Sequence, residues 1–250
     1  GQVPAYLGSS FAFIGPIVRI SAAWGLPYAL GGAVAAGLVY VLVAFIISRI
    51  GLDWIDKILP PVVIGSVIMV IGLGLASHAV QNLGGLVEGS TLADPNVRVA
   101  LFTLVITVVG TMFFKGFFAV VPILIGVIAG YLFAVTQGIV DFTLVREAAW
   151  FGFPGFILPK FNTFATLTML PVALVTIAEH LGDVGVLSKI TGKDFYREPG
   201  LHRTLLGDGL ATSLAGFVGG PPNTTYGENV GVLAITKIFN VSVIKTAAVL

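Results

Sequence analysis

Three acidic residues, Glu179, Asp183 and Glu228, lie in stretches that are otherwise long and apolar. A carboxylate at the centre of a bilayer costs about 3 kcal/mol, so an acid at that depth is a candidate functional group. Glu179 and Asp183 are four residues apart and share one face of a helix. Two neighbouring acids in a dry site resist ionising together, which favours retention of a proton. This pair is therefore predicted to exchange protons, and Glu228 to bind a polar ligand.

Two of these acids, and the other titratable side chains, also have structural interpretations. Asp183 also lies near a charged stretch, where it is either functional or simply solvated. Glu228 stands where a helix begins, and the helix dipole favours its anion there. Asp208 is expected to be a structural partner of Arg203 or of a loop amide. Packed or interfacial positions are expected for the three histidines, which are His78, His180 and His202.

Composition and motifs exclude several classes of function. The chain has no Cys, which excludes disulfides, thiolate chemistry and cysteine metal sites. Its net charge of +1 gives no reason to expect a nucleic acid partner. Phosphate-loop, zinc-protease, hydrolase and dinucleotide motifs are absent from the sequence. We therefore expect no enzyme, no cofactor and no metal.

Residues 221–229 interrupt the apolar sequence with two prolines, small polar residues, an aromatic residue and an acid. The prolines prevent the segment from beginning as a helix, which becomes possible from Glu228 onward. Residues 8–12 have a similar order of hydroxyl, aromatic and small residues. Two interrupted segments in corresponding positions indicate the midplane site of a transporter. We expect two short crossing strands that satisfy each other's backbone groups, with Phe11 or Tyr226 stacking on a planar ligand.

The overall composition predicts an integral membrane protein. Of the 250 residues, 56% are hydrophobic and 10% are charged, whereas a soluble domain has about 25% charged residues. The apolar runs are long and continuous, which favours helical spans over a membrane barrel. The chain begins and ends abruptly, so we expect a fragment cut at both ends.

The predicted spans follow from these apolar runs. Residues 1–24 are expected to be extended to about Phe13 and then to form a short helix. Gly182–Arg203 is expected to be a loop or a surface helix. The predicted spans or half spans are Pro27–Ser48, Ile58–Val80, Val99–Phe114, Phe117–Val140, Phe161–Leu181, Thr204–Gly220, Glu228–Asn240 and a last one beginning at Val241. With this assignment, nine Lys and Arg residues fall on one side and four on the other, which places the first side in the cytoplasm.

A signature follows the second interruption. The order is an acid or amide, Asn, any residue, Gly, four residues, Thr and a basic residue, and it is matched by Glu228, Asn229, Gly231, Thr236 and Lys237. This stretch resembles the signature of the nucleobase–cation symporter-2 family, also called nucleobase–ascorbate transporters. The uracil permease branch is resembled in particular by three further segments, residues 222–227, 4–13 and 177–180. Purine-transporting branches more often have Gln where Glu228 stands.

The resemblance implies an all-α polytopic membrane protein. Its fold would be a 14-span transporter of two inverted seven-span repeats, with two broken spans that contain short strands. This chain would be a fragment running from span 3 into span 11. Residues 1–50 (spans 3–4) and 161–250 (spans 8–11) would belong to the core domain, and residues 51–160 (spans 5–7) to the gate domain.

The resemblance also implies roles for single residues. Glu179 and Glu228 would bind the ring N–H groups of a nucleobase, and Gly227 would read its carbonyl groups through the backbone. Phe11 would pack on the face of the base, and Tyr226 is a further substrate-binding candidate. Glu179 is the main candidate for proton coupling, together with Asp183. Some uracil carriers have His at the position of Asp183, so the proton relay is left open.

Three functions remain as expectations. The leading one is proton-coupled uptake of uracil by alternating access, by a multi-pass homodimer in the cytoplasmic (inner) membrane. The second is a xanthine or urate permease of the same family. The third is an anion transporter of the related sulfate-permease architecture, which would place a cationic residue where this chain has carboxylates.

Overall fold

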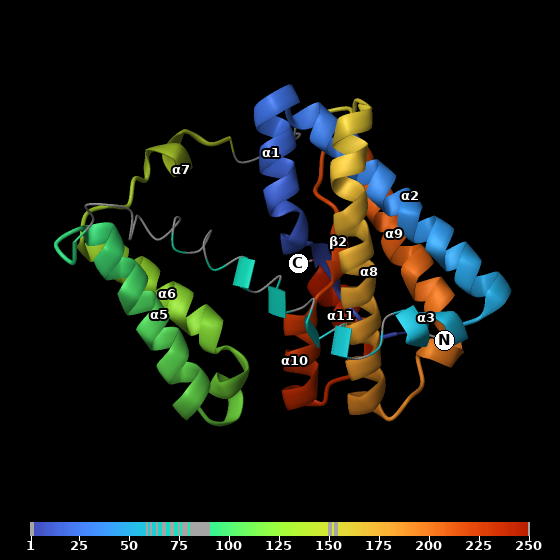
Figure 1. Ribbon diagram of the computed structural model, residues 1–250. Helices are drawn as coiled ribbons and strands as arrows, with labels where there is room; N and C mark the ends of the chain where they lie inside the picture. The colour runs from blue at the N-terminus through green and yellow to red at the C-terminus, as the bar shows by residue number, and fades with distance from the viewer. Residues whose placement is uncertain are drawn as a thin grey trace. The chain divides into compact units, whose positions relative to one another are not determined.

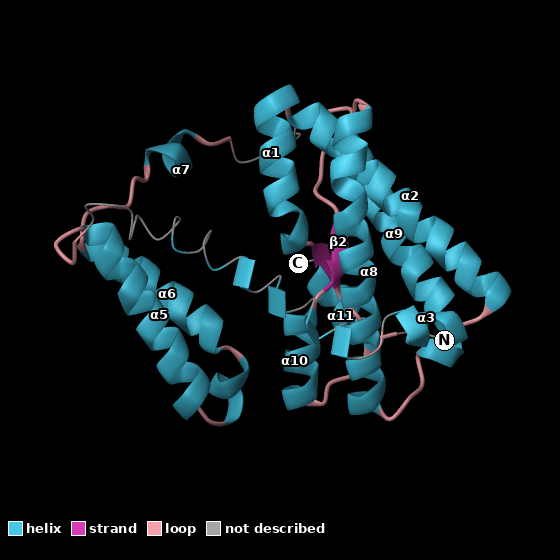
Figure 2. Cartoon of the chain, in the orientation of Figure 1, coloured by secondary structure: helices cyan, strands magenta, loops and turns pink. Residues whose placement is uncertain are grey.

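The computed structural model describes residues 3–58, 91–149 and 155–249, together with residue 152 and scattered positions between 60 and 80. The described chain is mainly helical (Figure 2). It forms two compact units, one of Gly1–Ile71 with Gly155–Leu250 and one of Gly72–Pro154. The second unit falls inside the predicted gate segment, residues 51–160, and the division into core and gate domains stays a prediction. About half of the residues in the predicted span Ile58–Val80 lie outside the described residues.

Three long helices form the framework of the first unit: α2 (Leu26–Ile50), α8 (Thr163–Thr191) and α9 (Leu201–Val218). Helix α2 packs against both α8 and α9 (Figure 1). Around this framework lie β1 (Leu7–Ser9), η1 (Phe11–Phe13), α1 (Ile14–Trp24), α3 (Asp53–Ile58), η3 (Tyr196–Gly200), β2 (Asn223–Thr225), α10 (Gly227–Thr236) and α11 (Val241–Val249). The two strands come from opposite ends of the chain and meet beside α8.

The second unit is a pair of packed helices, α5 (Pro95–Phe113) and α6 (Pro122–Thr136), with η2 (Gly116–Val120) between them and α7 (Thr143–Glu147) after them. Asp94 caps α5 by accepting a hydrogen bond from the backbone N–H of Asn96 at 2.8 Å. The predicted span Phe117–Val140 placed Pro122 inside a helix, and this is wrong. Pro122 begins α6, because proline lacks an N–H and suits the first turn.

Helices of membrane-spanning length occur in both units. Among the described residues, α2, α5 and α8 are long and apolar enough to cross a bilayer, and the segments Phe11–Trp24 and Pro122–Thr136 are shorter apolar helices. The predicted spans Pro27–Ser48 and Val99–Phe114 are confirmed by α2 and α5, with slightly different ends. The prediction of an all-α membrane protein is therefore confirmed, and the fold of 14 spans in two inverted repeats stays a prediction.

Helix α8 is longer than its sequence predicts. Its expected end was Leu181, but it continues through Gly182 to Thr191. Gly192 then ends the helix in a left-handed conformation, with its N–H donating to the carbonyl of Ser188. The prediction of a loop or surface helix from residue 182 is therefore wrong for the first ten residues. Asp183 lies inside this helix and is 8% exposed, so the interpretation as a solvated loop residue is also wrong.

Helices α2 and α9 approach closely through glycines. Gly37 of α2 faces Gly209 of α9, and a Cβ added to Gly37 would lie 2.6 Å from the carbonyl oxygen of Gly209. Small residues of this kind let the backbones of membrane helices come close together. Next to this contact, the hydroxyl of Ser213 donates to the carbonyl of Val34 at 3.3 Å.

We expect Gly37→Ala to destabilise the folded protein, because the backbone of α9 cannot move away without losing this packing. Overpacking of this kind costs about 1–3 kcal/mol. The measurement is the thermal unfolding midpoint of the full-length protein in detergent. Gly15→Ala in α1 is the matched control, because an added Cβ there meets nothing within 4 Å. Equal midpoints for the two variants would contradict the packing.

Candidate functional site

The two interrupted segments pair with each other as an antiparallel ladder. Leu7 lies opposite Thr225, Gly8 opposite Thr224 and Ser9 opposite Asn223. Further backbone bonds extend the ladder at both ends: Ser10 N–H donates to the carbonyl of Pro222 at 2.9 Å, and Tyr226 N–H to that of Tyr6 at 3.0 Å. The expected pair of short strands is confirmed. In lipid, such mutual pairing satisfies backbone groups that a broken helix leaves open.

Each strand leads into a helix. Strand β1 is followed by η1 and α1, and β2 by α10, whose first residue is Gly227. The first backbone bond of α10 runs from Val230 N–H to the carbonyl of Tyr226 at 3.2 Å. The N–H groups of residues 227–229 therefore have no partner within the helix and can bind a ligand's carbonyl groups. Glu228 is the second residue of α10, and its side chain lies outside the described part of the structure.

The ring of Tyr226 joins the two segments. Its hydroxyl donates to the carbonyl of Ser9 at 3.1 Å and lies 3.2 Å from the Ser9 hydroxyl. The ring of Phe11 is nearly parallel to it, with the centroids 6.4 Å apart and the planes at 22°. Phe11 is 49% exposed, which leaves much of its ring available for another planar group. The structure therefore brings together the two aromatic residues that were each a candidate for stacking on a planar ligand.

We expect Gly8→Ala to displace the Tyr226 ring and weaken ligand binding. A Cβ added to Gly8 would lie 2.6 Å from a ring carbon of Tyr226, closer than van der Waals contact allows. The shift breaks the hydroxyl's bonds to Ser9, so the apparent affinity for the ligand falls about tenfold. The measurement is equilibrium binding to the full-length protein, with Gly15→Ala as the control that places a methyl group in open space. Unchanged affinity in Gly8→Ala would show that Tyr226 does not shape the site.

The two acids of α8 both face this region. Helix α8 contacts η1, β2 and α10 (Figure 1). Glu179 is half-buried, and its Oε2 accepts a hydrogen bond from the Thr224 hydroxyl at 3.4 Å. Asp183 is buried one turn later, with its Oδ1 3.1 Å from where a Cβ on Gly227 would lie. The structure thus gathers Phe11, Tyr226, Gly227, Glu179 and Asp183 around the strand pair, and their roles in binding and proton coupling stay predictions.

A buried polar cluster behind β2 was missed in the sequence. His180 is 2% exposed, and its Nδ1 lies 2.9 Å from the Thr225 hydroxyl and 3.2 Å from Asp208 Oδ2. Its Nε2 lies 3.0 Å from the Thr204 hydroxyl. The packed position expected for His180 is confirmed, but the expected partner of Asp208 is wrong: Asp208 is fully buried against His180, whereas Arg203 is exposed. The signal that could have revealed this cluster is Asp208, a carboxylate within an apolar segment.

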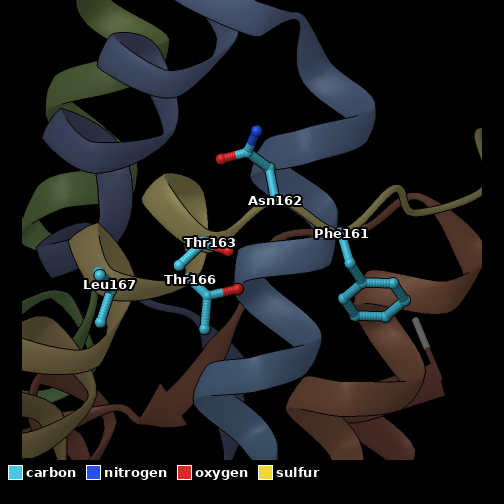
Figure 3. A pocket seen from close by; sticks show the side chains of 5 residues that line it. All are labelled: Phe161, Asn162, Thr163, Thr166 and Leu167. Atoms are coloured by element: carbon cyan, nitrogen blue, oxygen red, sulfur yellow. The ribbon is translucent and has the colours of Figure 1, made fainter.

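Two cavities in the first unit lie away from these residues. One is an open hollow of about 530 Å³ at the start of α8, where three polar side chains stand between Phe161 and Leu167 (Figure 3). Asn162 caps the helix there by accepting from Phe164 N–H at 2.8 Å, so its oxygen is already used. The other is an apolar cavity of about 120 Å³ whose lining includes Ile17, Leu30 and Pro222. The described lining of neither cavity includes Phe11, Tyr226, Gly227, Glu179 or Asp183.

Comparison with known proteins agrees with the family resemblance seen in the sequence. The family model described as "Permease family" matches residues 1–250. The chain is 52% identical to a uracil permease of Bacillus subtilis (strain 168) over 266 residues, and 46% identical to one of Escherichia coli (strain K12) over 250. It is 39% identical to the protein named putative pyrimidine permease RutG of Escherichia coli (strain K12).

These alignments cover the whole chain but only 60%, 58% and 58% of the three relatives, so the chain spans less than two thirds of their length. All three names describe permeases, as expected from the sequence, and not enzymes. The match over every residue and the signature at the start of α10 lead to one conclusion. The chain belongs to the nucleobase–cation symporter-2 family of membrane permeases, in its uracil permease branch.

Proposed function

We propose that the full-length protein containing this chain carries uracil across the cytoplasmic membrane, together with protons, by alternating access. The observation that carries the proposal is the crossed strand pair, which sets Glu179 of α8 beside the segment leading to Glu228. The names of the relatives support uracil as the substrate. The protein would be a multi-pass homodimer in the bilayer, with its more basic side in the cytoplasm.

The chemistry of uracil suits this arrangement. Uracil is flat and presents two N–H donors and two carbonyl acceptors along its edges. Carboxylates at Glu179 and Glu228 would accept its N–H groups, and charge-assisted bonds of this kind are stronger than neutral ones. The open backbone N–H groups at Gly227 and the following residues would donate to its carbonyls. Phe11 would cover its face, with Tyr226 behind it.

Proton coupling would use the acids of α8. Glu179 and Asp183 are one turn apart on the same helix, so their charges repel when both are ionised. A proton on Glu179 would neutralise its carboxylate. The occupied site could then pass low-dielectric surroundings without the free-energy cost of a buried charge. Asp183, which faces Gly227 at the N-terminus of α10, would be stabilised as an anion by the helix dipole.

Substrate competition tests this function. Cells that express the full-length protein should accumulate labelled uracil, and excess unlabelled uracil should inhibit the accumulation whereas excess xanthine should not. Collapse of the proton gradient with an uncoupler should abolish accumulation. Strong inhibition by xanthine with none by uracil would replace the proposal with a xanthine or urate permease. Uptake of an inorganic anion instead would favour the sulfate-permease-like alternative.

A further inference from the structure

Two consecutive residues of α8 hold two consecutive residues of β2. Glu179 accepts from the Thr224 hydroxyl at 3.4 Å, and His180 Nδ1 lies 2.9 Å from the Thr225 hydroxyl. Successive side chains of a strand point to opposite faces, so Glu179 and His180 bind side chains on different faces of the strand. Thr224 and Thr225 are 3% and 1% exposed, so both of their hydroxyls are shielded from water.

The His180 ring is fixed from behind as well. Asp208 of α9 is fully buried, its Oδ2 lies 3.2 Å from Nδ1, and neither of its oxygens accepts a hydrogen bond from any other described residue. A buried carboxylate of this kind requires a proton donor beside it. Thr204, also on α9, donates to the carbonyl of Leu201 at 3.0 Å and so presents a lone pair to Nε2 at 3.0 Å. The ring therefore bridges three elements, α8, α9 and β2.

We propose that His180 is a positioning residue for the substrate site: with Asp208 behind it, it sets strand β2 against α8 through Thr225. This role rests on the proposed function, because the site that His180 would position is the proposed uracil site. Glu179 is adjacent to His180 in the chain, and Tyr226 is adjacent to Thr225. The His180–Thr225 contact thus fixes the spacing between the carboxylate on α8 and the N-terminus of α10, which must bind opposite edges of one small base.

Two amide substitutions separate this role from simple packing. His180→Asn places an amide near the position of Nδ1, within reach of Thr225 and Asp208. His180→Gln places the amide near the position of Nε2, towards Thr204, and leaves Thr225 and Asp208 without their partner. We expect KM for uracil uptake by the full-length protein to rise at least about tenfold in His180→Gln, with a smaller change in maximal rate. In His180→Asn it should stay within about threefold of the parent.

Thr225→Val and Thr204→Val provide the second pair of variants. Each removes one hydroxyl at nearly constant volume. Thr225→Val should raise KM as His180→Gln does, and combining the two should add nothing further, because both break the same contact. Thr204→Val should raise KM less than Thr225→Val does, because it leaves the ring's contact with strand β2 in place.

Backbone hydrogen exchange provides a readout that does not depend on uracil. A peptide covering residues 223–226 should exchange faster in His180→Gln and Thr225→Val than in the parent or in His180→Asn, and a peptide from α2 should not change. If the parent takes up no uracil, the proposed function fails, and the exchange data still test the positioning role. Equal KM and equal exchange in the Asn and Gln variants would overturn the inference, as would an unchanged Thr225→Val.

Discussion

Glu179→Gln should abolish the accumulation of uracil against its gradient while leaving the protein folded. Glutamine keeps the shape of the side chain, and its amide oxygen still accepts the Thr224 hydroxyl, which donates to Glu179 at 3.4 Å. It has no proton to exchange at any physiological pH, so proton-driven transport stops. It also turns a charge-assisted bond to the base into a neutral one, at a cost of about 1.5–3 kcal/mol, or more than tenfold in affinity.

The measurement is made in proteoliposomes that contain the full-length protein. Uptake driven by an imposed proton gradient is compared with exchange of labelled for unlabelled uracil at saturating concentration. We expect the variant to lose the first and to retain part of the second, since exchange does not require net proton movement. Glu147→Gln is the control, because Glu147 is an exposed acid of α7. Parental accumulation by Glu179→Gln would show that the proton is carried elsewhere.

Glu228→Gln should remove most uracil binding. Glu228 is the second residue of α10, where the helix dipole stabilises its negative charge and where three backbone N–H groups lack a helical partner. A carboxylate only accepts hydrogen bonds, whereas an amide also directs donors at the N–H edge of the base. We expect a loss of about 2–4 kcal/mol, which combines the missing charge with a mismatched donor.

Equilibrium binding of labelled uracil to the purified full-length protein measures this effect. Glu198→Gln is the matched control, since Glu198 is an exposed acid outside α10. The thermal unfolding midpoint of both variants should match that of the parent when uracil is absent. Unchanged uracil affinity in Glu228→Gln would refute its assignment to the substrate site.

The site's backbone was predictable because its sequence is so unlike its surroundings. Two prolines and a run of small polar residues, between long apolar segments, allow no continuous helix at residues 221–226. Backbone groups left open in lipid must find partners, and the similar segment near residues 8–12 was the available one. The ladder between Leu7–Ser9 and Asn223–Thr225 follows from that requirement.

Helix ends were less predictable, because they depend on packing that one sequence does not display. Gly182 and Gly185 are poor helix formers, but α8 continues through both because its buried face packs against α2 and β2. The sequence predicts a span that contains Pro122, because residues 116–120 are as apolar as those that follow. A proline at the first turn was the correct reading, because such a position needs no N–H.

The cluster of His180, Asp208 and Thr225 could not be predicted from the sequence for a different reason. Its members are separated by 28 and 17 residues along the chain, and the register of α8 against α9 brings them together. Sequence periodicity says which face of a helix a residue occupies, but not which residue of another helix lies opposite. The expected partners of Asp208, Arg203 or a loop amide, are therefore near it in sequence, whereas its partner in space is His180.

The most direct test of the account is the thermal stability of the full-length protein with and without uracil, measured across pH. A ligand at 100 times its dissociation constant stabilises the folded state by about 2.7 kcal/mol, so binding is visible as a rise in the unfolding midpoint. We predict that uracil raises the midpoint of the parent in a pH-dependent manner, that xanthine at the same concentration does not, and that Glu228→Gln removes the effect. No shift with uracil at any pH, or an equal shift in Glu228→Gln, would contradict a uracil site at the crossed strands.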